Sequence, residues 1–230
     1  GIDTYGSISS VARSDVNMVI TVNPNTHKIL ITSIPRDYYV TLAGKNAKDK
    51  LTHAGIYGIE TSVGTIENLL DIKINYYIKV NFTSLLDIVE ALGGVNVYSE
   101  YSFTSKDGYY YKKGYNSVDG KKALSFVRER GAFTEGDRVR VKNQAAMIEA
   151  LINKAISPSI IVKYTSLLNA LDGSFVTNIP TKDITDFIKK QIDEMPEWEF
   201  ENISLDGSNG YDYTYSYGGT KLYVMIPDNE

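Results

Sequence analysis

The chain of 230 residues is 43% hydrophobic and 23% charged, an ordinary composition for a globular protein that buries one substantial core. Its formal net charge of −4 argues against a general nucleic-acid binder, because such proteins present a basic face to the phosphate backbone. Since cysteine is absent, disulfides, thiolate metal sites and a cysteine nucleophile are excluded.

The first predicted elements are a hairpin and a helix. Residues 16–22 and 28–34 have the composition of β-strands, and the turn-forming residues 23–26 join them. Pro35 ends the second strand, which places Arg36 and Asp37 at a strand end, where side chains often face a cleft. Apolar residues at helical spacing predict a helix over residues 58–70.

The middle of the chain alternates between strands and helices. A strand over residues 75–82 leads into a helix that Thr83 or Ser84 can cap and that stops at Gly93 and Gly94. The remaining predicted elements here are short strands over 95–100 and 109–114, a short helix over 117–129 and a long amphipathic helix over 135–156.

The last third adds helices over 160–171 and 182–194 and strands over 198–205 and 221–226. In "YDYTYSYGG" (residues 211–219) tyrosine occupies every second position, which favours a solvent-facing hairpin, with a sugar-stacking surface as the alternative. This order of elements predicts an α/β fold, an α-β-α sandwich whose central sheet is mixed but mostly antiparallel. We expect residues 1–230 to form a single domain.

The helix predicted over 135–156 has a buried and an exposed face. Arg138 lies on the exposed flank and should point to water, whereas Arg140 lies at the edge of the buried stripe and should point inward. A buried guanidinium needs an anionic partner. An Asp137–Arg140 ion pair would be a purely structural solution. The stripe consists of Val141, Ala145, Ile148, Ile152 and Ala155, with Asp137 and Gln144 inside or beside it.

Three arginines can meet at one point. Arg128 and Arg130 are two residues apart, so an extended segment would direct both to the same side, where Arg140 arrives from the following helix. Guanidinium groups bind phosphate oxygens in a bidentate manner better than lysine does. A carboxylate such as Glu129 or Glu135 could satisfy one of the three arginines, but not all of them.

Six motifs occur in order along the chain: "SIPRDYYV", "DKLTHA", "NYYIKVNF", "ALGGVNV", "ALSFVRERG" and "GDRVRVKNQ". Together they resemble the LytR-CpsA-Psr proteins of bacterial cell envelopes. The resemblance is strongest over residues 1–156, and residues 157–230 would supply C-terminal helices and strands of the same domain. It implies a phosphotransferase that moves a glycopolymer from an undecaprenyl-pyrophosphate carrier to N-acetylmuramic acid of peptidoglycan.

The resemblance also implies roles for individual residues. It implies that Asp3 and Asp15 hold Mg²⁺, an ion that prefers carboxylate and phosphate oxygens. We assign Asp37 to a turn cap, and His53 to packing or capping rather than to a general base. The implied pyrophosphate contacts are Arg36, Arg128, Arg130 and Arg140, supported by Gln144 and, as a weaker candidate, Lys50; Asp137 orients Arg140, and the catalytic set is Arg36, Asp15 and Arg140.

A polyprenyl chain must be kept from water in an apolar slot. Its expected walls are Leu85, Leu86, Ile88, Val89, Ile148 and Ile152, for which an ordinary core is the alternative. Capsular polysaccharide is the preferred polymer, because "GDRVRVKNQ" resembles streptococcal capsule members, and wall teichoic acid is the second choice. The alternative activities are a pyrophosphatase or lipid-carrier binding module, and a regulator that acts on nucleic acid.

The family resemblance also predicts a location. Members are typically anchored by an amino-terminal transmembrane helix, which this chain does not contain. We therefore expect the chain to be an ectodomain fragment from the extracellular face of the plasma membrane of a Gram-positive bacterium.

Overall fold

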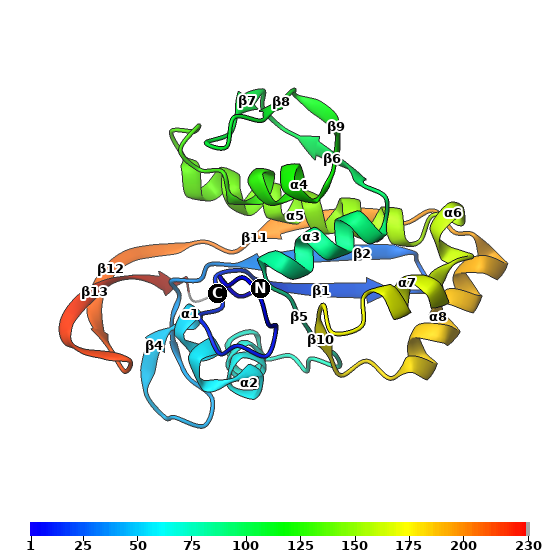
Figure 1. The fold of residues 1–230 in the computed structure, drawn as a ribbon. Coiled ribbons are helices and arrows are strands. Elements are labelled where there is room, and N and C mark those ends of the chain that lie inside the picture. Colours follow the sequence, from blue (N-terminus) through cyan, green and yellow to red (C-terminus); the bar gives the residue numbers. More distant parts are fainter. Residues whose placement is uncertain (229–230) are drawn as a thin grey trace.

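A three-stranded mixed sheet lies at the centre of the computed structural model, which describes residues 1–228 (Figure 1). The strand order is β1 (Asn17–Asn23), β2 (Lys28–Ile34), β11 (Glu199–Ser204), with β1 antiparallel and β11 parallel to β2. The hairpin predicted from the sequence is confirmed. Its turn forms because the Asn23 side chain accepts hydrogen bonds from the next backbone N–H groups, at 3.1 and 3.2 Å.

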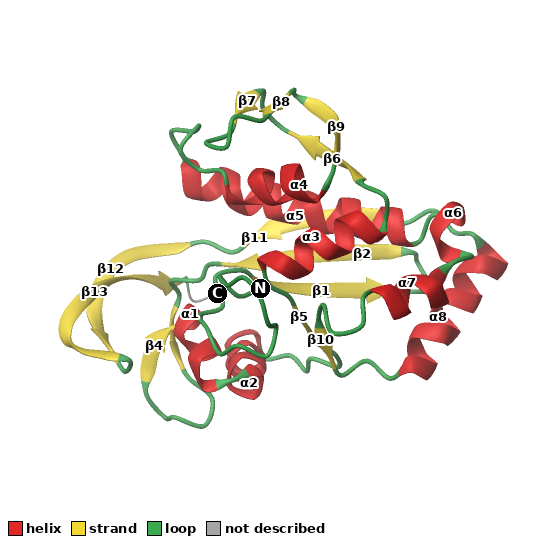
Figure 2. Cartoon of the chain, viewed as in Figure 1, coloured by secondary structure: helices red, strands yellow, loops and turns green. Residues whose placement is uncertain are grey.

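Helices cover both faces of this sheet (Figure 2). The long helix α5 (Gly136–Ala155) packs on one face, and α1 (Leu51–Ala54) and α2 (Ile59–Leu70) pack on the other. The predicted α-β-α arrangement and α/β class are therefore confirmed. The contacts are Ala145, Ile148 and Ile152 with Ile29 and Ile31 on the α5 face, and Leu51, Ala54 and Ile66 with Ile34 on the other.

Helix α5 is buried on two sides rather than one. Of the predicted stripe, Ala145, Ile148 and Ile152 face the sheet but Ala155 does not, and Val139, Asn143, Met147 and Ala150 are buried as well. Met147 and Ala150 join a second core with α3 (Phe82–Ala91) and α4 (Gly120–Arg128). The sequence pattern predicted only one buried stripe. The second face of α5 is buried by a layer that distant segments of the chain form over it, and a local pattern cannot show such a layer.

That outer layer contains two short two-stranded sheets. Strand β6 (Val95–Ser99) pairs with β9 (Gly114–Val118), and β7 (Phe103–Thr104) pairs with β8 (Tyr110–Tyr111). The stacked rings of Phe103 and Tyr111, whose centroids are 4.8 Å apart, lie beneath them.

The start of α3 differs from the prediction. Asn81, rather than Thr83 or Ser84, is the N-cap, and its side chain accepts from the backbone N–H of Ser84 at 2.9 Å. Ser84 completes the capping box by accepting from the Asn81 N–H. The predicted stop is confirmed, since Gly93 and Gly94 follow the helix with φ of 70° and 84°.

Several predicted elements are shorter or divided. The strand expected over residues 75–82 is limited to β5 (Ile78–Lys79), which pairs with β10 (Val176–Thr177). The helix expected over residues 160–171 is split into α6 (Pro158–Ile161) and α7 (Tyr164–Ala170), whereas α8 (Thr181–Glu194) matches its prediction.

Two further hairpins lie beside α1. Strands β3 (Tyr39–Thr41) and β4 (Lys48–Lys50) form a short hairpin that the sequence did not predict, and the 3₁₀ turn η1 (Gly55–Tyr57) follows α1. Strands β12 (Gly207–Thr214) and β13 (Tyr217–Pro227) form a long hairpin that projects from the body (Figure 1). A helix that spans a membrane must be both long and apolar. Within residues 1–228, no helix combines the length and apolar character needed to cross a bilayer.

Candidate functional site

Arg36 is at the carboxyl end of β2, as the sequence predicted. Its Nη1 donates to Asp15 Oδ2 at 3.1 Å, and its Nε lies 3.5 Å from Asp37 Oδ2. The other oxygen of Asp15 accepts from Thr52 Oγ1, in α1, at 2.9 Å. Thr52 was not identified from the sequence, because its contact with Asp15 depends on how α1 packs against the chain before β1.

Asp37 and Lys50 extend this ion-pair network. The Asp37 carboxylate accepts from Lys50 Nζ at 2.8 Å, and the Lys50 side chain is only 14% exposed. The turn after β2 is closed instead by the Tyr38 N–H bond to the Pro35 carbonyl. The Asp37 carboxylate therefore does not close this turn; it bridges the cations of Arg36 and Lys50. The phosphate contact expected of Lys50 stays a prediction.

Arg138 and Arg140 point in the directions that the helical periodicity predicted. The Arg138 side chain is 69% exposed and pairs with Asp206, whereas the Arg140 side chain is 14% exposed and pairs with Asp137 at 3.0 Å. Asp137 itself is 60% exposed, so its place inside or beside the buried stripe is not borne out. The contact needed for Asp137 to orient Arg140 is present.

Burial lowers the pKa of Arg140; the nearby Asp137 opposes this effect, and the positive charges of Arg36 and Arg130 add to it. The guanidinium groups of Arg36, Arg130 and Arg140 are therefore close enough to repel one another, although they come from the end of β2, the segment after α4 and α5. Among residues 1–228, the buried Nε atoms of Arg36 and Arg140 make no hydrogen bond. Such a site favours an additional anion.

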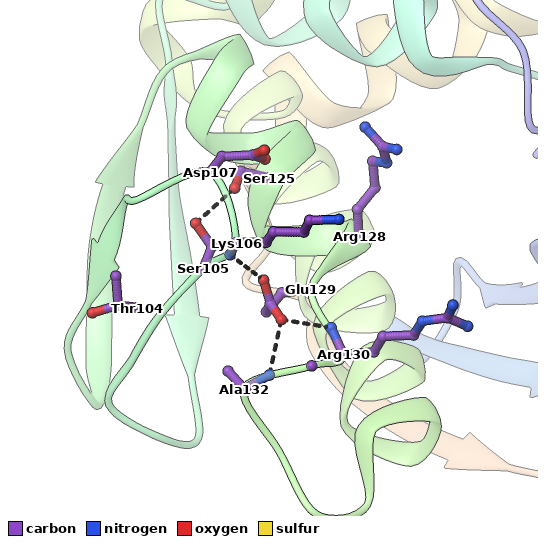
Figure 3. A pocket seen from close by; sticks show the side chains of 10 residues that line it. Thr104, Ser105, Lys106, Asp107, Ser125, Arg128, Glu129, Arg130 and Ala132 are labelled. Atoms are coloured by element: carbon purple, nitrogen blue, oxygen red, sulfur yellow. Dashed lines mark hydrogen bonds between the residues drawn. The ribbon is translucent and has the colours of Figure 1, made fainter.

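The side chains of three consecutive residues, Arg128, Glu129 and Arg130, point to two different sides of the chain (Figure 3). Arg128 is the last residue of α4 rather than part of an extended segment, but Glu129 is extended. The two arginine side chains point to the same side, as predicted, while Glu129 points away from them.

Glu129 neutralises no guanidinium. Its side chain is buried, and its carboxylate accepts backbone N–H groups of Lys106, Arg130 and Ala132 at 2.6, 3.0 and 2.9 Å. The expectation that Glu129 could satisfy an arginine is therefore wrong. Within the described part of the chain, neither Arg128 nor Arg130 forms an ion pair with a carboxylate.

Arg128 is held by two aromatic side chains. Its Nη1 donates to the Tyr5 hydroxyl at 3.0 Å, and its guanidinium lies 4.8 Å from the centre of the Phe82 ring. Beside it is a polar hollow of about 710 Å³ that runs from the β7–β8 connection to the arginine segment (Figure 3). Its lining includes Ser105, Lys106, Asp107, Ser125, Arg128 and Arg130.

Gln144 connects the two elements that carry the arginines. Its Nε2 donates to the carbonyl of Val127 at 3.3 Å. This bond fixes the last turn of α4, just before Arg128, against α5, which carries Arg140. The supporting role predicted for Gln144 thus has a structural basis.

Asp3 and Asp15 lie on neighbouring chain segments, because Ile2 and Ser14 form an antiparallel bridge. Asp3 is exposed, and Asp15 is partly buried. Across residues 1–228, no three histidine or carboxylate side chains are grouped closely enough to hold a metal ion. A magnesium ion at these two aspartates would therefore need further oxygen ligands from a substrate or from water, as Mg²⁺ usually does.

The six residues expected to line a lipid slot fall into two clusters. Val89 is buried among α3 and α4 with Leu85, Leu86 and Ile88 beside it, whereas Ile148 and Ile152 face the sheet. They do not form one continuous wall. Two residues of the edge strand β1, Ile20 and Val22, are other candidates for contact with a lipid. The strand register places both on the side that faces α5, where they are 41% and 44% exposed.

His53 belongs to a buried polar network. Its Nδ1 lies 2.6 Å from Asp49 Oδ1, and both side chains are almost fully buried. Asp49 Oδ2 also accepts from the backbone N–H and the hydroxyl of Ser216, in the β12–β13 turn. The expectation that His53 is a packing residue is confirmed.

The sequence pattern of the LytR_cpsA_psr family matches residues 1–225. TagU of Bacillus anthracis, a polyisoprenyl-teichoic acid–peptidoglycan teichoic acid transferase, is 37% identical over 217 residues, which cover 94% of this chain and 69% of that protein. The crystal structure of TagV from B. subtilis superimposes with a TM-score of 0.80 at 30% identity, covering 99% of this chain and 88% of TagV. A structure of TagT bound to LI-WTA gives 0.73 at 27% identity, covering 99% and 81%.

Proposed function

The chain belongs to the LytR_cpsA_psr family, and we propose that it is an enzyme that transfers a cell-envelope glycopolymer from a polyprenyl-pyrophosphate carrier to peptidoglycan. The name of the related TagU specifies teichoic acid, a polyisoprenyl carrier and peptidoglycan. Teichoic acid is therefore the first donor to test. Capsular polysaccharide, which the "GDRVRVKNQ" motif favours, is the second, with undecaprenyl as the expected carrier.

The convergence of guanidinium groups, of which those of Arg36 and Arg140 are largely buried, carries this proposal. Arg36, Arg130 and Arg140 come from three separate elements, and burial together with mutual repulsion lowers the pKa of Arg140. Arg128 and Arg130 have no carboxylate partner among residues 1–228. A pyrophosphate supplies the missing negative charge and accepts bidentate hydrogen bonds from the planar guanidinium groups.

The same arrangement suits phosphoryl transfer. The acceptor hydroxyl of N-acetylmuramic acid attacks the phosphorus that bears the glycan, and the bond from that phosphorus to the bridging oxygen breaks. The bridging oxygen leaves with the lipid phosphate and takes the electron pair, so charge develops where guanidinium groups can stabilise it. Asp15 is the first candidate to accept the proton of the hydroxyl.

Asp3 and Asp15 offer the oxygen ligands that Mg²⁺ prefers, and a bound ion would neutralise part of the pyrophosphate charge. Both oxygens of Asp15 already accept hydrogen bonds, from Arg36 and Thr52. A carboxylate has about four lone-pair sites, so these bonds leave room for a metal. The Arg36 and Thr52 contacts would orient the Asp15 carboxylate for such an ion.

An apolar surface for the lipid lies at the edge of the sheet. Ile20 and Val22 are large, exposed side chains on the α5-facing side of β1, and covering them with a polyprenyl chain would remove apolar area from water. Partly buried Ile148 and Ile152 of α5 lie over the same sheet face. Since the proposed carrier is a membrane lipid and the proposed acceptor is peptidoglycan, we propose that the enzyme works at the extracellular face of the plasma membrane.

Substitution of Arg140 tests this function, with Arg138→Ala as the matched control. Arg140→Ala should weaken binding of polyprenyl pyrophosphate about 10- to 100-fold, the value of a charge-assisted contact, and should reduce transfer accordingly. Arg138→Ala should leave both nearly unchanged, since that side chain is 69% exposed. Equal losses in the two variants would contradict the proposed site.

The assay should separate transfer from hydrolysis. Labelled donor is incubated with and without peptidoglycan, and polymer-bound label is measured together with released lipid monophosphate. Transfer requires that label appear on peptidoglycan. Release of lipid monophosphate at the same rate without an acceptor would instead indicate a pyrophosphatase, and binding without either product a carrier-binding module.

A further inference from the structure

A row of tyrosine side chains lies exposed on one face of the β12–β13 hairpin. Tyr211 and Tyr213, two residues apart on β12, are 69% and 52% exposed. The register pairs Tyr211 with Tyr223 of β13, and their ring centres are 6.0 Å apart in an edge-to-face arrangement. Lys221 Nζ lies 5.5 Å from the Tyr213 ring centre. We call these four residues the tyrosine face.

The hairpin is held firmly to the body of the protein. Ser216, in its turn, donates a backbone N–H to Asp49 at 2.8 Å, and Asp49 is fully buried. The hydroxyls of Tyr57 and Ser216 are 3.0 Å apart, and the Tyr39 hydroxyl donates to the Tyr213 carbonyl at 2.9 Å. Because these contacts already order the hairpin, a ligand could bind to it without a large cost in conformational entropy.

The tyrosine face continues into the arginine site. Lys50 Nζ, which binds the Asp37 carboxylate at 2.8 Å, also lies 5.8 Å from the centre of the Tyr223 ring. Asp37 in turn pairs with Arg36. Lys50 and Asp37 therefore link the tyrosine face to the proposed pyrophosphate site at Arg36.

The chemistry of this face suits an uncharged sugar chain. The rings offer flat apolar surfaces for the C–H faces of pyranose units, and the hydroxyls and Lys221 offer hydrogen bonds. Partial burial, followed by the charges of Asp37 and Asp137, raises the pKa of Tyr223. A phosphate-rich polymer such as teichoic acid would be attracted more strongly to the arginines than to such rings.

We infer that the tyrosine face binds the glycan strand of the peptidoglycan acceptor and directs its hydroxyl toward the arginine site. This inference rests on the proposed transferase function, because it identifies the acceptor surface of that site. The exposed aromatic surface, its rigid attachment and its continuity with the ion-pair network around Arg36 each support it.

The test compares exposed tyrosines of the β12–β13 hairpin with exposed tyrosines on other strands. Tyr211→Ala/Tyr213→Ala is compared with Tyr110→Ala/Tyr115→Ala, whose side chains are 69% and 67% exposed on strands β8 and β9. Binding to purified peptidoglycan without attached teichoic acid is measured by co-sedimentation, and the donor and acceptor KM values are measured in the transfer assay.

The tyrosine-face variant should bind peptidoglycan about tenfold more weakly and should raise the acceptor KM to a similar extent. Its affinity for the polyprenyl-pyrophosphate donor should match that of the unchanged protein. The Tyr110→Ala/Tyr115→Ala control should retain normal peptidoglycan binding. Tyr211→Lys, which keeps a long side chain but removes the ring, should reproduce the loss if stacking is responsible.

Two results would overturn the inference: equal peptidoglycan binding by both double variants, or a change confined to the donor KM. Binding to peptidoglycan is measured without a donor, so it tests the tyrosine face independently. Normal transfer by Arg140→Ala would instead refute the proposed catalytic site while leaving the peptidoglycan measurement intact.

Discussion

Glu129 shows how one carboxylate can organise cations without neutralising them. It lies between Arg128 and Arg130, yet its oxygens accept the backbone N–H groups of Arg130, Ala132 and Lys106. The segment is thereby fastened to the β7–β8 connection while both guanidinium groups stay available. A carboxylate bound to the arginines themselves would compete with an incoming anion.

Replacing Glu129 by alanine should therefore damage both stability and binding. Three N–H groups lose their acceptor, so the free energy of unfolding should fall by about 1–3 kcal/mol, and pyrophosphate affinity should fall because Arg130 is no longer held. Urea unfolding and donor titration measure the two effects. Glu135→Ala is the control, since Glu135 is exposed and makes no capping hydrogen bond; a similar loss in that variant would argue against this role.

Asp49 gives a prediction for acid stability. Burial alone would raise its pKa, but hydrogen bonds from His53, Ser216 and the Lys50 N–H outweigh burial and lower the pKa below its ordinary value of 3.8. The folded state thus holds this proton less tightly than the unfolded state. The resulting stabilisation is complete above the ordinary pKa and is lost as pH falls through the lowered value.

The free energy of unfolding, followed by denaturant titration from pH 6 down to about pH 2, should show this loss below about pH 4. Asp49→Asn should be less stable at neutral pH and should have a shallower acid slope. Asp172→Asn changes an exposed carboxylate and should retain the slope of the unchanged protein. An Asp49→Asn slope as steep as that of the unchanged protein would contradict the assignment.

At the scale of elements, the start of α5 must approach the arginine segment closely. A Cβ atom on Gly136 would lie 2.2 Å from the carbonyl oxygen of Arg130, a separation that neither backbone can tolerate without moving. Glycine therefore permits Arg130, before the helix, and Arg140, within it, to share one region. The contact of Gln144 with Val127 reinforces the same junction.

Gly136→Ala should separate these two elements. We expect a lower melting temperature and roughly tenfold weaker pyrophosphate binding, equivalent to about 1.4 kcal/mol. The matched control is Gly131→Ala, because a Cβ there would meet its nearest atom, Glu129 Oε1, at an ordinary 3.5 Å. The close approach would lose its proposed importance if both alanine variants bound pyrophosphate equally well.

At the scale of the whole molecule, the three layers leave one edge of the sheet open. Helix α5 covers β2 and β11 but leaves Ile20 and Val22 of β1 exposed on the same face. Such a partly covered apolar surface, with the arginines at the carboxyl end of β2, matches the shape of a donor that has a long hydrocarbon chain and a charged head.

Donor chain length should reveal this surface. Ile20→Asn should weaken binding of a long polyprenyl-pyrophosphate donor about fivefold, corresponding to about 1 kcal/mol of lost apolar burial, but should not affect a short-chain analogue. Ile203→Asn is the control, because Ile203 is 40% exposed, compared with 41% for Ile20, and lies on the opposite face of the sheet. An equal effect on both chain lengths would rule out a lipid contact at Ile20.

Local pattern was sufficient for much of the fold. The β1–β2 hairpin, α2, α5 and α8 agree with the prediction within a residue or two, because turn residues and helical periodicity act over short stretches. The β3–β4 hairpin was missed and the helix after Pro158 was divided. These short elements are stabilised by contacts with distant segments more than by their own sequence.

The sequence by itself determined which arginines are present and in which direction their side chains point. Arg140 points inward and Arg138 outward, and Arg128 and Arg130 point to one side. Only the tertiary structure decided their partners. Arg36 meets Asp15, Glu129 binds the backbone of Lys106, and Asp49 anchors Ser216, 167 residues away. Periodicity describes the direction of a side chain from its own backbone, whereas a partner distant in sequence is brought near only by the packing of layers.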